Sequence, residues 1–113
     1  MKAVLDENVP RKLIPDLRKF GCEVERFPND WKGLRNGGLL DRLEELGFDC
    51  LITCDKNIEW QQPLLKRRVA VVVLPLQDLA ALRSIADEIA TAITSTEPGK
   101  VRNLLLDRRS DPD

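Results

Sequence analysis

The chain has 113 residues and a net charge of −1, with 42% hydrophobic and 33% charged residues. This length and composition predict one globular domain with a single core. The near-neutral charge argues against a surface that attracts nucleic acid as a whole, so such a role needs local basic clusters. The sequence contains no histidine, which excludes histidine acid–base catalysis, a Ser-His-Asp triad and a zinc site with histidine ligands.

The cysteines Cys22, Cys50 and Cys54 lack the C-x-x-C spacing of a metal or redox motif. Two of them stand in an apolar run, where a reduced thiol behaves as a small hydrophobic side chain. Acids follow Leu5 directly, so no signal peptide is predicted, and no apolar stretch approaches the ~20 residues of a membrane span. We therefore expect a cytoplasmic protein with reduced cysteines.

The first half of the chain predicts two strands, each followed by a helix. Residues 2–5 form a short apolar strand, and Pro10 suits the first turn of the helix that follows. A second strand covers residues 22–27, with Val24 directed inward. Asn36 caps the next helix. The apolar stripe of that helix consists of Leu39, Leu40, Leu43 and Leu46.

The second half continues the alternation of strand and helix. Residues 50–53 and 69–74 are continuous apolar runs, which is typical of parallel strands that are covered on both faces. A partly helical segment joins them, and Asp78 caps a last helix that extends to about residue 93. The order predicts a small three-layer α/β/α sandwich with a mainly parallel sheet of about four strands. This domain covers residues 1–94, and a polar C-terminal tail covers residues 95–113.

Two of the predicted strands end in an acid, because Asp6 follows the first and Asp55 follows the strand near residue 52. In an open parallel sheet, ligands bind beyond the carboxyl ends of the strands, near the switch in strand order. Two acids that meet there repel each other unless a proton, a lysine or a divalent cation offsets their charge. Carboxylates favour Mg²⁺ or Mn²⁺, which activate water and stabilise phosphoryl transfer. Each acid alone is typical of a cap or a loop, but the pair, with Asn8 and Asn57 placed similarly, favours a functional cleft.

Basic and amide side chains near these acids predict contacts with a nucleic-acid backbone. Arg11 and Lys12 open the helix after the first strand, and the N-terminus of a helix itself attracts anions. A basic run at residues 66–68 adds positive charge. Trp31 and Trp60 either stack on bases or fill gaps in the core. The predicted nucleic-acid-binding residues are Arg11, Lys12, Lys56, Gln61 and Gln62.

Four segments, LDENVPRKL, LRNGGLLDRLEELGFDCLITCDKN, EWQQ and VAVVVL, span roughly residues 1–76 and resemble short PIN-like proteins related to ribonuclease toxins of the VapC type. The resemblance implies a PIN-like sandwich and metal-dependent cleavage of RNA. It also implies a toxin–antitoxin gene pair, with an antitoxin protein and a second copy of the chain as partners. In this comparison Asp6 matches the metal-binding acid of the first strand. Asp55 matches the acid of a T-x-D motif whose threonine is Thr53.

The chain departs from the family pattern at two positions. Many relatives have an acid that opens the central helix, where this chain has Asn36, and a further acid after the T-x-D motif, where it has Asn57. Each change removes one negative charge but keeps a carbonyl oxygen, and Glu7 or Asp41 can compensate for it. The predicted site consists of the catalytic residues Asp6, Asp55 and Asn36, the metal ligands Asp6, Asp55 and Glu7, and the supporting residues Asn8, Thr53 and Asn57.

Three functions fit these features. The first is a metal-dependent endoribonuclease of the PIN-like type, as the toxin of a toxin–antitoxin pair. The second is a weakened or inactive relative that binds RNA or a protein partner, because acids are missing at positions 36 and 57. The third is a phosphoacceptor receiver domain, which expects Thr or Ser after the next strand and Lys-Pro after a fifth strand. The sequence has Pro75 and Leu76 at the first of these places and predicts no fifth strand.

Overall fold

A computed structural model describes residues 2–31, 33–34, 36–55 and 67–104, with the side chains of residues 36 and 37 left out of the description. The elements in chain order are β1 (Lys2–Leu5), η1 (Arg11–Leu13), α1 (Ile14–Arg18), β2 (Glu23–Glu25), η2 (Asn29–Trp31), α2 (Asn36–Glu45), β3 (Cys50–Thr53), β4 (Ala70–Val73), α4 (Leu79–Ser84), α5 (Ala86–Ser95) and β5 (Val101–Asn103).

The five strands form one sheet in the order β2-β1-β3-β4-β5, and all neighbouring pairs are parallel. This confirms the predicted α/β class. The chain first adds β2 on one side of β1 and then adds β3 on the other side, so the switch in strand order lies between β1 and β3. The carboxyl ends of these two strands therefore flank the place where open sheets bind ligands.

The sheet has one strand more than the sequence predicts, because β5 lies within the segment that was expected to be a polar tail. β5 pairs with β4 in a register that places Val101 beside Val71 and Asn103 beside Val73. Only three residues long and only partly buried, β5 lacks the apolar run that marks a strand in the sequence. Backbone hydrogen bonds to β4 hold it in the sheet, and they depend little on its side chains.

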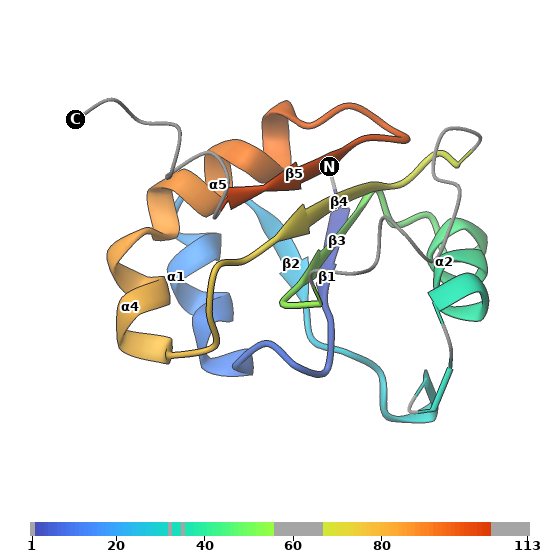
Figure 1. The fold of residues 1–113 in the computed structure, drawn as a ribbon, viewed down its shortest axis with the longest axis horizontal. Helices are drawn as coiled ribbons and strands as arrows, with labels where there is room; N and C mark the ends of the chain where they lie inside the picture. The colour runs from blue at the N-terminus through green and yellow to red at the C-terminus, as the bar shows by residue number, and fades with distance from the viewer. Residues whose placement is uncertain (1, 32, 35, 56–66, 105–113) are drawn as a thin grey trace.

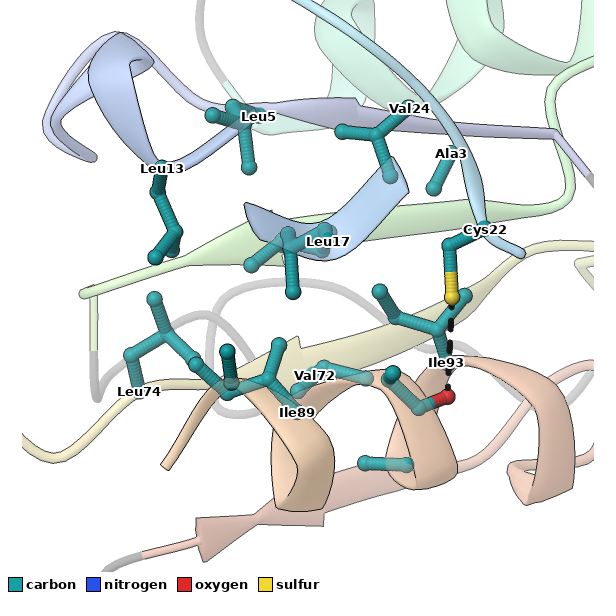
Figure 2. Close-up of a cluster of buried hydrophobic side chains, with 14 of the residues drawn as sticks. Ala3, Leu5, Leu13, Leu17, Cys22, Val24, Val72, Leu74, Ile89 and Ile93 are labelled. Carbon is teal, nitrogen blue, oxygen red and sulfur yellow. Dashed lines mark hydrogen bonds between the residues drawn. The ribbon is translucent and has the colours of Figure 1, made fainter. Parts of the chain in front are cut away.

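Helices cover both faces of the sheet, as Figure 1 shows, with α1, α4 and α5 on one face and α2 on the other. Side chains alternate between the faces along each strand. Leu5 and Ile52 belong to the core under α1, α4 and α5, whereas Val4 and Leu51 belong to the core under α2. Figure 2 shows the first of these cores, in which Leu17 of α1 lies among strand side chains and Ile89 and Ile93 of α5.

Two helices differ in detail from the prediction. The helix after β1 begins as the short 3₁₀ turn η1, and α1 has Pro15 in its first turn, where a missing N–H group costs no hydrogen bond. The predicted last helix is divided at Ile85, whose φ of −119° and ψ of 22° leave the helical region. Asp78 caps α4 as predicted, since its carboxylate accepts a hydrogen bond from the Ala81 N–H.

All three cysteines are free, and Cys22 and Cys50 are buried. Burial raises the pKa of the Cys50 thiol to about 12, so this side chain stays protonated and packs as a small hydrophobic group. The Cys22 Sγ lies 3.8 Å from the Ala90 carbonyl oxygen, the contact drawn as a dashed line in Figure 2. None of the helices in the described ranges is long and apolar enough to cross a membrane.

Candidate active site at the carboxyl edge of the sheet

Asp6 and Thr53 occupy neighbouring positions just where β1 and β3 end. The register pairs Leu5 with Ile52, and the Asp6 N–H donates a hydrogen bond of 2.8 Å to the Ile52 carbonyl. Because side chains alternate along a strand, the next residues, Asp6 and Thr53, share one face of the sheet. The Thr53 hydroxyl donates a hydrogen bond of 2.8 Å to Asp6 Oδ2. The threonine of the predicted T-x-D motif therefore fixes the acid of the first strand.

Thr53 is the centre of a hydrogen-bond network that joins the two strand ends. Its side chain is fully buried, and its Oγ1 accepts hydrogen bonds from the Asp55 N–H at 3.0 Å and from Asn8 Nδ2 at 3.4 Å. Asn8 Oδ1 in turn accepts a hydrogen bond of 3.0 Å from the Cys54 N–H. The network fixes the path of the chain from Thr53 to Asp55, and hence where Asp55 lies relative to Asp6.

Asp6 is the acid whose ionisation the site alters. Burial raises the pKa of its carboxyl group, and the negative charges of Glu7 and Asp55 raise it further, while hydrogen bonds from the Thr53 hydroxyl and the Glu7 N–H act in the opposite direction. The structure brings Asp6, Glu7 and Asp55 to one edge of the sheet, as the strand-end pattern predicts.

The chemistry of these donors fits a hard divalent cation. Mg²⁺ in proteins is usually held by one or two carboxylates, with water completing the shell. A cation at Asp6 and Asp55 would offset the burial and repulsion that disfavour the ionised form of Asp6. Within residues 2–31, 33–34, 36–55 and 67–104 no group of three acidic or cysteine side chains is arranged to hold a metal ion. Asp6 and Asp55 supply the one or two carboxylates that such a cation usually requires.

A cavity of about 320 Å³ opens beside Asp6, where β1 and β2 end. Arg11, a predicted nucleic-acid-binding residue, lines it, whereas Lys12 does not. Arg26 and Phe27 also line it, although the sequence analysis missed them. A signal was available for Arg26 and Phe27, because both residues stand at the carboxyl end of the strand predicted over residues 22–27. The lining residues are Leu5, Asp6, Glu7, Val9, Arg11, Arg26, Phe27 and Asn29.

A second hollow, of about 390 Å³, lies where β3 and β4 end. Gln77 Nε2 donates a hydrogen bond of 2.8 Å to the Asn8 carbonyl at its edge. Since β1 and β3 are adjacent in the sheet, Asp6 and Thr53 lie between the two hollows in the strand order. The lining residues are Asn8, Cys54, Leu74, Pro75, Leu76 and Gln77.

Trp31 is not available to stack on a base, and that interpretation of the sequence was wrong. Its side chain is only 4% exposed. It packs edge-to-face against Phe27 and Phe48, with ring centroids 5.8 and 6.0 Å apart. The sequence places Trp31 between two polar stretches and gives no sign of these contacts. The contacts join residues that precede α2 in the sequence to Phe48, which follows it.

Two residues of the basic run at 66–68, Arg67 and Arg68, are described, and both contact acids of α2. Arg67 forms ion pairs with Asp41 and Glu44 of α2, and Arg68 Nε lies 3.7 Å from Glu44 Oε2. Two of these basic charges therefore hold α2 against the start of β4. Asp41, proposed to replace a missing acid, is paired with Arg67 instead.

Several predicted residues fall outside the described part of the structure. α2 begins at Asn36, which is within one residue of the start expected if Asn36 is the N-cap. The side chain of Asn36 is not described, so its role as a cap stays a prediction. The other predictions that stay untested for this reason concern Lys56, Asn57, Trp60, Gln61 and Gln62.

No family model, no curated protein and no solved structure matches this chain. A function can therefore only be proposed, from its own residues, their geometry and the resemblance of residues 1–76.

The strand order bears on the receiver-domain alternative, because receiver domains have the same order and β5 supplies the fifth strand that was thought missing. The required side chains are absent, however. Leu74 and Pro75 follow β4 in place of Thr or Ser, and residues 104–113 contain no lysine. The missing fifth strand is therefore no longer a reason to reject a receiver domain. The missing Thr or Ser and Lys side chains still are.

Proposed function

We propose that the protein is a metal-dependent endoribonuclease of the PIN-like type that acts in the cytoplasm as the toxin of a toxin–antitoxin pair. One observation carries the proposal: at the switch in strand order, the Thr53 hydroxyl donates a hydrogen bond to the Asp6 carboxylate and accepts one from the Asp55 N–H. Two carboxylates at this edge suit the hydrolysis of a phosphodiester in a protein that has no histidine. The resemblance of residues 1–76 to PIN-like proteins points to RNA as the substrate.

In this proposal, Asp6 and Asp55 hold Mg²⁺ or Mn²⁺ through their carboxylate oxygens. The bound cation would supply an activated water and offset charge on the scissile phosphate. Thr53 keeps the Asp6 carboxylate in one orientation through its hydroxyl. Arg11, in the adjoining cavity, attracts the negatively charged backbone of the substrate. Asn36, at the start of α2, contributes an amide oxygen in place of the acid of many relatives.

The alternative is an inactive PIN-like protein that binds RNA or a protein partner. It is favoured by the two asparagines at positions 36 and 57, which leave fewer negative charges to hold a cation. RNA binding is common to both proposals, so only cleavage separates them.

Cleavage of a mixed RNA pool with Mn²⁺ or Mg²⁺, and with EDTA, tests the proposal. Asp6→Asn and Asp55→Asn should lower the rate by at least about a hundredfold, because each replaces a negatively charged metal ligand with a neutral amide. Asp87→Asn is the matched control, since it removes the same charge from an exposed residue of α5 and should leave the rate unchanged.

Activity of the purified protein that survives both EDTA and the two substitutions would refute the mechanism. RNA binding without any metal-dependent cleavage would support the alternative. The toxin role is tested separately: expression of the chain should arrest growth, and co-expression of the adjoining open reading frame should relieve the arrest.

A further inference from the structure

Two arginines in the cavity beside Asp6 have no partner among the described residues. Arg11 follows β1 at the start of η1, Arg26 follows β2, and both side chains line the cavity. Neither side chain forms a hydrogen bond or an ion pair with another described residue. Other arginines differ in this respect, since each contacts a described carboxylate or carbonyl: Arg18, Arg42, Arg67 and Arg83.

The chemistry of the cavity suits a phosphate with an attached base. A guanidinium presents its N–H donors in a fixed fork that matches phosphate oxygens. Phe27 forms an apolar wall, and its ring is held by the edge-to-face contact with Trp31 at an interplanar angle of 89°. The volume of about 320 Å³ is at the low end of the range for small-molecule sites, ~300–1,000 Å³. It is therefore suited to one nucleotide and not to a longer stretch.

We infer that this cavity binds the nucleotide next to the scissile phosphate of a single-stranded RNA. Arg11 and Arg26 bind the phosphate of that nucleotide, and Phe27 packs against its base. The hollow on the other side of Asp6, by contrast, has no charged residue in its described lining. In this inference the RNA strand passes from Asp6 over the end of β2, where Arg11 and Arg26 lie. The inference rests on the proposed function for the position of the scissile bond, but the binding it describes requires no cleavage.

Fluorescence anisotropy with a labelled single-stranded RNA of mixed sequence, measured in EDTA, tests the binding. Arg11→Ala and Arg26→Ala should each weaken affinity about tenfold and reduce the slope of log affinity against log salt by ~0.7, the value for one lost phosphate contact on a single strand. Arg26→Lys keeps the charge but loses the fork, so it should still weaken binding by about threefold.

Arg42→Ala is the matched control, because it removes an exposed arginine of α2 and the same unit of charge. It should change affinity by less than about twofold. Equal affinities for Arg26→Ala and Arg42→Ala would overturn the inference, and so would a wild-type chain that binds no RNA. Thermal unfolding of each variant shows that the fold is retained.

The two proposals fail separately. RNA that binds through Arg11 and Arg26 but is never cleaved with Mn²⁺ supports this inference and refutes the nuclease. Metal-dependent cleavage in which Arg26→Ala leaves both affinity and KM unchanged supports the nuclease and overturns the subsite. If both hold, Arg26→Ala should raise KM about tenfold with a smaller effect on kcat, since Arg26 touches the bound strand and not the reacting atoms.

Discussion

The Thr53 hydroxyl donates a hydrogen bond to Asp6 Oδ2, so a buried side chain of β3 sets the orientation of an acid that follows β1. The same oxygen accepts the N–H of Asp55 and the amide of Asn8. One hydroxyl thus contacts the carboxylate of Asp6 and the backbone of Asp55. Its loss should therefore be visible in stability and in the ionisation of Asp6.

Thr53→Val keeps the shape of the side chain and removes its hydroxyl. The change leaves Asp6 Oδ2, Asn8 Nδ2 and the Asp55 N–H without this partner, and it should destabilise the fold by about 1–3 kcal/mol. It should also raise the pKa of Asp6 further, because the lost hydrogen bond favoured the ionised form. Thr53→Ser keeps the hydroxyl and is the control. Urea unfolding that finds Val at least as stable as Ser at this position would contradict the role of the hydroxyl.

Asp6→Asn should change how stability depends on pH. Burial raises the pKa of Asp6 in the folded state, so the wild-type protein loses stability as pH rises from the unfolded-state pKa of about 3.9 through the folded-state value. An asparagine does not titrate. The stability of Asp6→Asn relative to wild type should therefore increase as pH rises from about 4 through the folded-state pKa of Asp6, in the absence of divalent cations. Denaturant unfolding at several pH values measures the difference, and parallel curves would show that the pKa of Asp6 is not raised.

Asn36→Asp restores an acid at the first residue of α2, where many PIN-like relatives have one. If this position belongs to the metal site, one added charge near the cation should strengthen Mn²⁺ binding by roughly 1–2 kcal/mol, about ten- to thirtyfold, after desolvation and repulsion are subtracted. If Asn36 only caps the helix, Asp is an equally good cap and binding should not change. Calorimetric titration of Mn²⁺ into both proteins separates the two, with equal affinities assigning Asn36 to the cap.

Arg67→Met should destabilise the fold by roughly 1 kcal/mol at pH 7, because Arg67 pairs with both Asp41 and Glu44 but the pairs are partly exposed. The hydrogen bond from Arg67 lowers the pKa of Glu44. This contribution is therefore fully present above the unfolded-state pKa of about 4.3 and disappears as pH falls through the lower folded-state value.

The matched control for this pair is Arg42→Met, which removes an exposed contact with Glu45 and should cost less than about 0.5 kcal/mol. Thermal unfolding at pH 7 and at low pH measures both variants. Equal losses for the two substitutions at pH 7, or a loss at Arg67 that is as large at a pH well below the folded-state pKa of Glu44, would show that the Glu44 pair contributes nothing specific.

The positions of β3 and β4, and of the acid that follows β3, follow from the sequence by itself. Both strands are continuous apolar runs, and a run of this kind is buried in a sheet whatever its neighbours are. The cap at Asp78 is equally local, because the carboxylate bonds a backbone group three residues away. Features that depend on a few adjacent residues can be read without knowledge of the fold.

Strand order and register were decided only by the tertiary structure. Thr53 reaches Asp6 across a separation of 47 residues, and Arg26 joins the same cavity because β2 pairs with the other side of β1. β5 joins the sheet through backbone hydrogen bonds, which leave almost no pattern in its side chains. Such contacts depend on which strands pair and in what register. Pairing and register depend in turn on the packing of the whole core, which is formed by residues that are distant in the sequence.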